Sequence, residues 1–109
     1  MEQRSEYRIV YPLPARPLAM IGRRPFSTLD VSEQALRVDQ RRVESPLVAG
    51  ERVAGMLRLA QRLDHPFEGV VQRAGARSAV VRLDAAFRID LPVIFQEQRC
   101  LRSRFPDWR

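Results

Sequence analysis

Apolar and polar residues alternate along much of the chain between residues 18 and 83. Leu36 and Val38 alternate with Arg37 and Asp39, a period of two that places both apolar side chains on one face of a strand. Similar strands, with β-branched and aromatic residues, are predicted at 26–31, 53–59, 67–73 and 78–83, and one more begins at Leu18. The pattern predicts a chain that is mainly β.

Glycine, proline and polar residues separate these strands. Turns and loops of this kind are expected at 22–25, 32–34, 41–50, 64–66 and 74–77. The turn at 74–77 joins its neighbouring strands into a hairpin. About six short strands at this spacing are typical of a closed sheet, so we expect a small six-stranded antiparallel β-barrel over residues 17–88.

The two ends of the chain follow other patterns. Residues 1–16 lead into a proline-rich stretch that excludes a helix, so we expect an extended N-terminal arm with local order at 5–10. At the other end, Asp90 is a suitable N-cap, Pro92 is tolerated in the first turn and Pro106 ends the helix. The residues at helical spacing in between are apolar Leu91, Ile94, Phe95, Leu101 and Phe105, with Gln96, Glu97, Arg99 and Arg102 on the polar side.

These patterns predict one domain over 1–109, made of an arm (1–16), a barrel (17–88) and a C-terminal α-helix (89–105). The helix is expected to pack Phe95 and Leu101 against the barrel as part of the core. Trp108, close to the end of the chain, either packs on the barrel or contacts a partner.

Composition and charge exclude several classes of function. The 109 residues carry 19 basic and 13 acidic side chains, a net charge of +6, and every basic residue is arginine. Without lysine, a Schiff base and a P-loop are impossible. The only cysteine is Cys100 and the only histidine is His65, in a predicted turn, which excludes an internal disulfide and a Cys/His zinc cluster. We expect neither an enzyme nor a cofactor.

The sequence has no pattern for membrane insertion or export. No apolar run approaches the ~20 residues that span a bilayer. The polar N-terminus is not followed by a signal-peptide core. We therefore expect a cytoplasmic protein with no membrane span.

Two groups of residues suggest a binding site. Arg4 and Arg8 lie four apart in the arm, where they would share a face if they formed a helical turn. Asp30 and Ser32 lie two apart at the end of a predicted strand and therefore share a face. Together they offer two guanidinium groups, a carboxylate and a hydroxyl.

These residues resemble the two motifs of the PilZ domain family, small bacterial β-barrels that bind cyclic di-guanylate. Arg4 and Arg8 match RxxxR, and Asp30 and Ser32 match [D/N]xSxxG in type, spacing and order. The predicted hairpin and C-terminal helix also fit, so the resemblance covers nearly the whole chain. It implies a second-messenger receptor in which Arg4 and Arg8 bind phosphate and guanine, while Asp30 and Ser32 contact the second guanine. Ligand binding would order the arm and change contacts with a downstream protein partner.

The chain departs from the family pattern at two positions. Ala35 stands where the second motif has glycine, and a positive φ there would cost alanine about 1–2 kcal/mol. Gln3 stands where many family members have another arginine, which favours one bound nucleotide over two. Ala35 therefore favours an alternative, a PilZ-like protein–protein adaptor that has lost or weakened nucleotide binding.

Other interpretations of these residues remain open. Arg4 and Arg8 are also suited to ion pairs with Glu2 and Glu6 on a solvated arm, and Asp30 and Ser32 to a turn that is compatible with ligand binding. The paired arginines 23–24 and 41–42 are expected to be exposed loop charges. A barrel of charge +6 also suits nucleic acid, but an aromatic content of 7% and no aromatic cluster on the strands argue against that partner.

Overall fold

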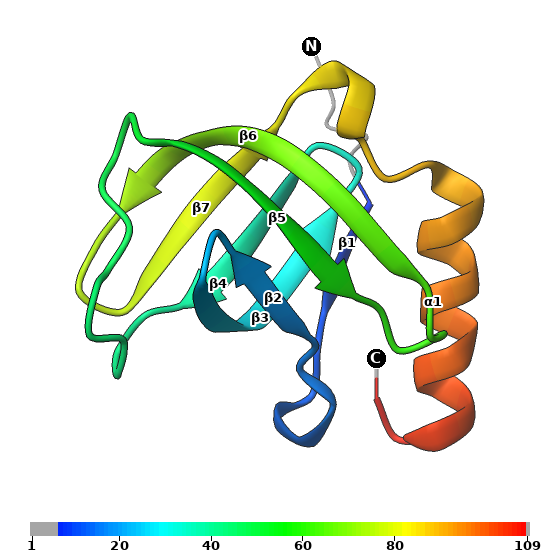
Figure 1. The fold of residues 1–109 in the computed structure, drawn as a ribbon. Helices are drawn as coiled ribbons and strands as arrows, with labels where there is room; N and C mark the ends of the chain where they lie inside the picture. The colour runs from blue at the N-terminus through cyan, green and yellow to red at the C-terminus, as the bar shows by residue number, and fades with distance from the viewer. Residues whose placement is uncertain (1–6, 109) are drawn as a thin grey trace, which may run out of the picture.

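The structure, a computed structural model, describes residues 7–108 and contains a closed six-stranded antiparallel barrel, one additional strand and one α-helix (Figure 1). The strands are β1 (Arg8–Val10), β2 (Leu18–Ile21), β3 (Arg24–Ser32), β4 (Ala35–Asp39), β5 (Arg52–Arg58), β6 (Asp64–Ala74) and β7 (Ser78–Leu83). The helix is α1 (Leu91–Arg104), and two short 3-10 turns are η1 (Leu13–Ala15) and η2 (Ala85–Phe87). The predicted fold class is confirmed.

The barrel runs in the order β3, β2, β5, β6, β7, β4 and closes where β4 pairs with β3. Strand β3 is long enough to pair with β2 through its first half and with β1 through its last three residues. A register shift between Thr28 and Asp30 in its pairing with β4 marks a bulge, which bends the strand where its neighbour changes. The additional strand β1, from the predicted arm, therefore lies beside the end of β3.

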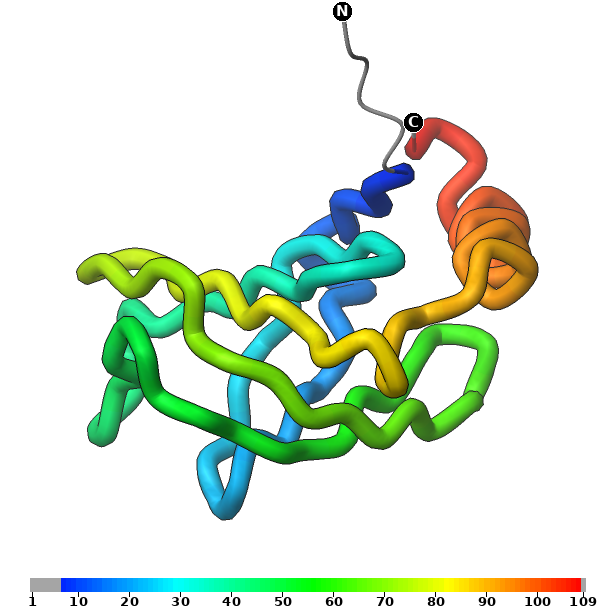
Figure 2. The backbone as a smooth tube through the Cα atoms, turned by 90° about the horizontal axis from the view of Figure 1, so that it is seen from above, coloured from blue at the N-terminus to red at the C-terminus, as the bar shows by residue number. Residues whose placement is uncertain are grey.

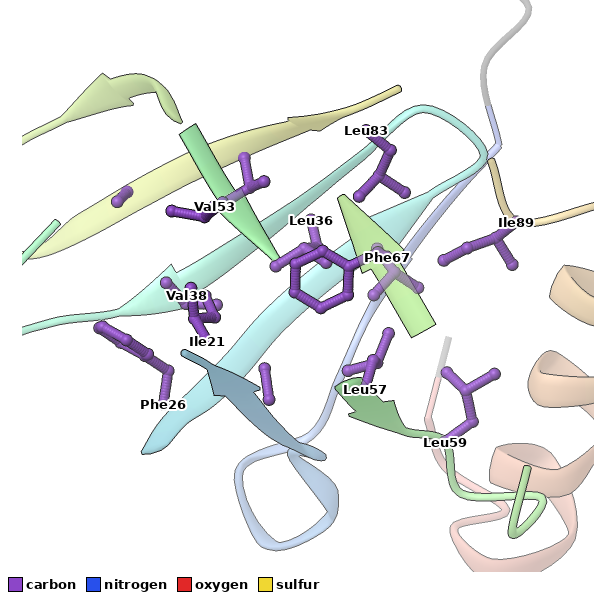
Figure 3. Packing of buried hydrophobic residues seen from close by; sticks show 14 of the residues in the cluster. Ile21, Phe26, Leu36, Val38, Val53, Leu57, Leu59, Phe67, Leu83 and Ile89 are labelled. Atoms are coloured by element: carbon purple, nitrogen blue, oxygen red, sulfur yellow. The ribbon is translucent and has the colours of Figure 1, made fainter. Parts of the chain in front are cut away.

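The inward positions of the strands form the core (Figure 3). Leu36, Val38, Leu57 and Phe67 are each at most 1% exposed, and the alternation that predicted their strands is the alternation between inside and outside. Burial of each such side chain contributes about 1.5–3 kcal/mol relative to leaving it in water. The outward positions of the same strands are left for solvent and ligands.

The turn predicted at 64–66 is wrong, because Asp64, His65 and Pro66 begin β6. The turn lies just before them: the Leu59 N–H donates to the Leu63 carbonyl oxygen at 2.9 Å, and Arg62 has a positive φ of 65°. Proline is tolerated in β6 because Pro66 pairs with β5 alone; pairing with β7 begins at Gly69.

Helix α1 lies at the side of the barrel (Figure 2). Leu101 is fully buried, as predicted, together with Ile94. Phe95 was expected in the core and is instead half-buried, with its ring in a T-shaped contact with Tyr7 at 5.0 Å between centroids. Trp108 packs against the core, and its Nε1 donates to the Val10 carbonyl oxygen at 2.7 Å.

Glu97 was assigned to the polar side of the helix, and this assignment is wrong because the residue is 0% exposed. Its Oε2 accepts hydrogen bonds from the Tyr11 hydroxyl at 2.6 Å and the Ala60 N–H at 2.7 Å. Its Oε1 accepts from the backbone N–H and the side-chain Nε2 of Gln61, at 3.2 and 2.8 Å. A buried charge is tolerated here because both oxygens are satisfied.

The Glu97 cluster, defined as Glu97, Tyr11, Ala60 and Gln61, joins the helix to two other parts of the fold. Tyr11 follows β1, and residues 60–61 belong to the turn between β5 and β6. Burial, and then the negative charge of Glu97, raises the pKa of Tyr11, so its hydroxyl remains a proton donor. The cluster fixes α1 against Tyr11, the residue that follows β1.

Within residues 7–108, no helix is long and apolar enough to cross a lipid bilayer.

Candidate functional site

Four of the five predicted site residues line one hollow on the outside of the barrel. Arg8, Asp30, Ser32 and Ala35 all border this space of about 290 Å³, while Arg4 lies outside the described residues. The other residues around it come from the β3–β4 turn and from β4, β6 and β7: Gln34, Leu36, Arg37, Gln72, Arg73, Val80 and Arg82. Residues distant in sequence therefore meet at one site, which we call the arginine hollow.

Strand register brings these side chains together. Arg8 of β1 lies opposite Ser32, and Asp30 lies opposite Arg37 of β4. The residues between them, such as Ile9 and Val31, point into the core, so the polar rows face outward. Arg8 lies on strand β1, and the helical turn considered for Arg4 and Arg8 does not occur at Arg8.

Two further arginines enter from β6 and β7. Arg82 lies opposite Ala35, and a bulge between Val71 and Arg73 places Arg73 opposite Val80. Without this bulge, the alternation of β6 would give Arg73 a different neighbour on β7. The hollow therefore collects arginines from four strands.

Asp30 is held by one of these arginines. The Arg37 Nε donates to Asp30 Oδ2 at 2.7 Å, and the two side chains are 41% and 9% exposed. Such a partly exposed pair contributes about 1 kcal/mol or less. It fixes the carboxylate in the wall of the hollow, where it can accept N–H groups of a ligand.

Ser32 and Ala35 close the turn between β3 and β4. The Ala35 N–H donates to Ser32 Oγ at 3.2 Å, so Ser32, and not Asp30, supplies the side-chain hydrogen bond of a turn. The strain considered for Ala35 is absent, because Arg62 is the only non-glycine residue with a positive φ within residues 7–108. What remains of the glycine-to-alanine difference is a methyl group in the lining of the hollow.

The hollow is strongly electropositive. Among the described residues, Arg8, Arg37, Arg73 and Arg82 line it against a single acidic residue, Asp30. In the part of the chain that the structure describes, only Arg37 of these four arginines forms an ion pair. Guanidinium groups that have no carboxylate partner are available to an anion, and their planar donors suit phosphate and guanine.

Sequence reasoning missed Arg37, Arg73 and Arg82. The alternation in Ala35–Asp39 marks Arg37 as outward, and Arg82 lies between the inward Val81 and Leu83. This signal identifies the face of each strand but not the neighbouring strand, so it could not bring the three arginines together. Of the paired loop arginines, Arg23, Arg41 and Arg42 are exposed as predicted, whereas Arg24 is half-buried in β3 and bound to Glu51 at 2.6 Å.

The residue types that bind metal ions do not form a site within residues 7–108. Among residues 7–108, no three or more His, Cys, Asp or Glu side chains lie close enough together to hold a metal ion. His65 Nε2 lies 2.9 Å from the Phe87 carbonyl oxygen, a contact that joins β6 to η2. Cys100 is a free, half-buried thiol on α1.

Neither a family model nor a curated protein matches this chain.

Proposed function

We propose that this protein is a cyclic di-guanylate receptor of the PilZ type and that the arginine hollow is its ligand site. The observation that carries the proposal is that Arg8, Asp30 and Ser32, which match the two motifs, converge on one hollow together with Ala35, which stands at the glycine position of the second motif. Three more arginines, Arg37, Arg73 and Arg82, border the same space. The protein acts in this proposal as a cytoplasmic signalling protein and not as an enzyme.

The chemistry of the ligand fits the chemistry of the lining. Cyclic di-guanylate is a dianion, and Arg8, Arg73 and Arg82 are positioned to contact its phosphates or the O6 and N7 atoms of guanine. The Asp30 carboxylate accepts guanine N–H groups, and Arg37 keeps it oriented. Each charge-assisted contact contributes about 1.5–3 kcal/mol.

The size of the hollow indicates that it takes up part of the ligand. Its 290 Å³ is at the lower end of the range of about 300–1,000 Å³ for small-molecule pockets. A dinucleotide would therefore extend beyond the rim. We propose that Arg4, the other arginine of the RxxxR motif, completes the site from the N-terminal side.

The position of β1 offers a route from the ligand to the helix. Arg8 borders the hollow, while Tyr11, three residues later, donates to Glu97 of α1. Contacts of Trp108 with Val10 and of Phe95 with Tyr7 connect the same segment to the C-terminal region. A ligand that holds β1 therefore also changes the free energy of helix docking, which a partner protein can detect.

Titration calorimetry with cyclic di-guanylate tests the proposal. We expect 1:1 or 2:1 binding in the micromolar range or tighter, lost in Arg8→Ala and Asp30→Ala. The matched control is Arg99→Ala, which removes one exposed arginine of α1 that does not border the hollow. Absence of heat and of a shift in melting temperature at high micromolar ligand, with folded protein, would reject the receptor function.

A second candidate is a PilZ-like adaptor with weakened or lost nucleotide binding. The methyl group of Ala35 in the lining favours it, because that group occupies space that glycine leaves open. The adaptor predicts no binding by the natural sequence and strong binding by Ala35→Gly. The receptor predicts binding by both.

A further inference from the structure

Further arginines line hollows that lie next to the arginine hollow on the outside of the barrel. Three more hollows, of about 450, 310 and 490 Å³, follow one another along this side of the barrel. Neighbouring hollows share lining residues: the first of them shares Arg37 and Arg73 with the arginine hollow, the next shares Arg37 and Arg77, and the last shares Arg16 and Arg41. They therefore form one groove, which we call the arginine track.

The track carries far more positive than negative charge. Its arginines are Arg16, Arg37, Arg41, Arg42, Arg73 and Arg77, and within residues 7–108 the one acidic residue in the lining of the three hollows is Asp39. Asp39 is already bound to Arg41 at 2.6 Å and lies 3.7 Å from Arg16. Among the described residues, Arg42, Arg73 and Arg77 form no ion pair. The track therefore fits an extended anion better than a single small one.

The residues that line the track favour an extended anion with carboxylates over single-stranded nucleic acid. Single-stranded nucleic acid is held by aromatic side chains that stack on its bases. Phe26 is the only aromatic residue in the lining of the track, and it is 2% exposed and thus not available for stacking. Guanidinium groups alone, without a stacking surface, are suited to carboxylates, which they bind with two parallel N–H donors.

The backbone of the track also restricts the mode of binding. Both edges of β4 are already paired, one with β3 and the other with β7 (Figure 1). An incoming segment cannot add a strand here and must bind through side chains. An extended peptide presents alternate side chains to the same face, so acidic residues at alternate positions would face the arginines.

We propose that the arginine track binds an acidic, extended polypeptide segment of a partner protein. This surface goes beyond the proposed nucleotide site, because Arg42 and Arg77 do not border the arginine hollow. The two sites meet at Arg37 and Arg73, which line both. A nucleotide in the hollow and a peptide in the track would therefore compete for these two arginines.

Fluorescence anisotropy with three labelled probes tests this inference: a peptide of about eight residues that alternates Glu and Ser, the same peptide with Gln for Glu, and a uridine oligonucleotide of equal length. Extended, the peptide spans about 27 Å. We expect the Glu peptide alone to bind at about 50 mM salt, and its affinity to fall at about 200 mM salt. Arg42→Ala with Arg77→Ala should weaken binding about tenfold, equivalent to about 1.4 kcal/mol.

The control removes the same charge from elsewhere on the surface. Arg88→Ala with Arg99→Ala changes two exposed arginines outside the track, and we expect less than a twofold effect on peptide binding. Equal weakening by both pairs, or no binding of the Glu peptide, would overturn the inference. Tighter binding of the oligonucleotide than of the Glu peptide would assign the track to nucleic acid instead. Because Arg42 and Arg77 lie outside the hollow, cyclic di-guanylate titrations of the same variants report separately on the proposed function.

Discussion

The arginine hollow and the Glu97 cluster are two polar regions with opposite character. In the cluster, a fully buried carboxylate accepts four hydrogen bonds from three residues. In the hollow, Arg8, Arg73 and Arg82 form no ion pair within the part of the chain that is described. In the Glu97 cluster both carboxylate oxygens have hydrogen-bond partners within the protein. In the arginine hollow, guanidinium N–H groups are available to another molecule.

This difference distinguishes polar residues that stabilise the fold from polar residues that are available to bind a ligand. A buried polar group must be paired inside the protein, because leaving it unpaired costs about 1–3 kcal/mol. An exposed arginine has no such requirement, because water solvates it. Four arginines around one hollow repel each other, and a bound dianion would relieve that repulsion.

Removal of the buried carboxylate should give the largest loss of stability. Glu97→Ala leaves the Tyr11 hydroxyl and the N–H groups of residues 60–61 without their acceptor. We expect a loss of about 3 kcal/mol or more, and a melting temperature lower by about 12 °C or more. Tyr11→Phe removes one of the four bonds and should cost less, about 1.5–3 kcal/mol. Urea unfolding of both variants measures the effects; a change under about 0.5 kcal/mol for Glu97→Ala would contradict the structural role.

Arginines of the hollow should show the opposite behaviour. Arg73→Ala and Arg82→Ala are each expected to weaken cyclic di-guanylate about tenfold or more, because each removes a charge-assisted contact. Neither should change the free energy of unfolding by more than about 0.5 kcal/mol, since both side chains are exposed. Calorimetry and thermal unfolding of the same samples separate the two effects. A large loss of stability with unchanged affinity would place these residues with the Glu97 cluster.

Asp30 is expected both to stabilise the fold and to contribute to the proposed ligand site. It is 6% exposed and paired to Arg37, and it also borders the hollow. Asp30→Asn should cost about 1 kcal/mol of stability and weaken the nucleotide about tenfold. The companion variant Arg37→Gln removes the other partner and should have the same two effects in the same direction. Affinity that is unchanged in both variants would exclude the pair from the binding site.

Ala35→Gly should have a small effect on affinity. The backbone at Ala35 has no positive φ, so glycine relieves no strain and removes only a methyl group from the lining. We expect at most about a threefold gain in affinity and a loss of about 0.5–1 kcal/mol of stability, since glycine is unfavourable in a strand. A gain of a hundredfold by calorimetry would instead support the adaptor with lapsed binding.

The smallest effect should be a pH-dependent one at Asp39. Hydrogen bonds from Arg41 lower the pKa of this carboxyl from 3.8 to about 2. Its contribution to stability is therefore fully present above about pH 4 and is lost as the pH falls through about 2. Because the pair is exposed, Asp39→Asn should cost less than about 1 kcal/mol. Melting temperatures of both proteins should differ by a constant amount above pH 4 and converge below it; a difference that grows with acid would contradict this.

Local patterns in the sequence predict the barrel strands and the helix of this protein. The six barrel strands and the helix were predicted because inward residues such as Leu36 and Val38 recur with a period of two, and Ile94 and Leu101 with a helical period. The motif spacing likewise brought Asp30 and Ser32 together, because residues two apart in a strand share a face. The turn predicted at 64–66 was wrong because proline is tolerated in a strand where one edge is unpaired, and Pro66 is paired with β5 alone.

Tertiary structure alone decided which faces meet and which charges are paired. A period of two predicts that Arg37 and Arg82 point outward, whereas Arg73, two residues after the buried Val71, faces outward only because of the bulge between them. The convergence of the three arginines depends on the register of β3, β4, β6 and β7 and on two bulges. Glu97 was placed on a polar helix face because its partners, Tyr11 and residues 60–61, are far away in the sequence. The spacing of hydrophobic residues predicts only which side chains face the core and which face water. Whether a polar side chain is buried with partners or left open for a ligand is decided by strands and helices that the chain brings together only on folding.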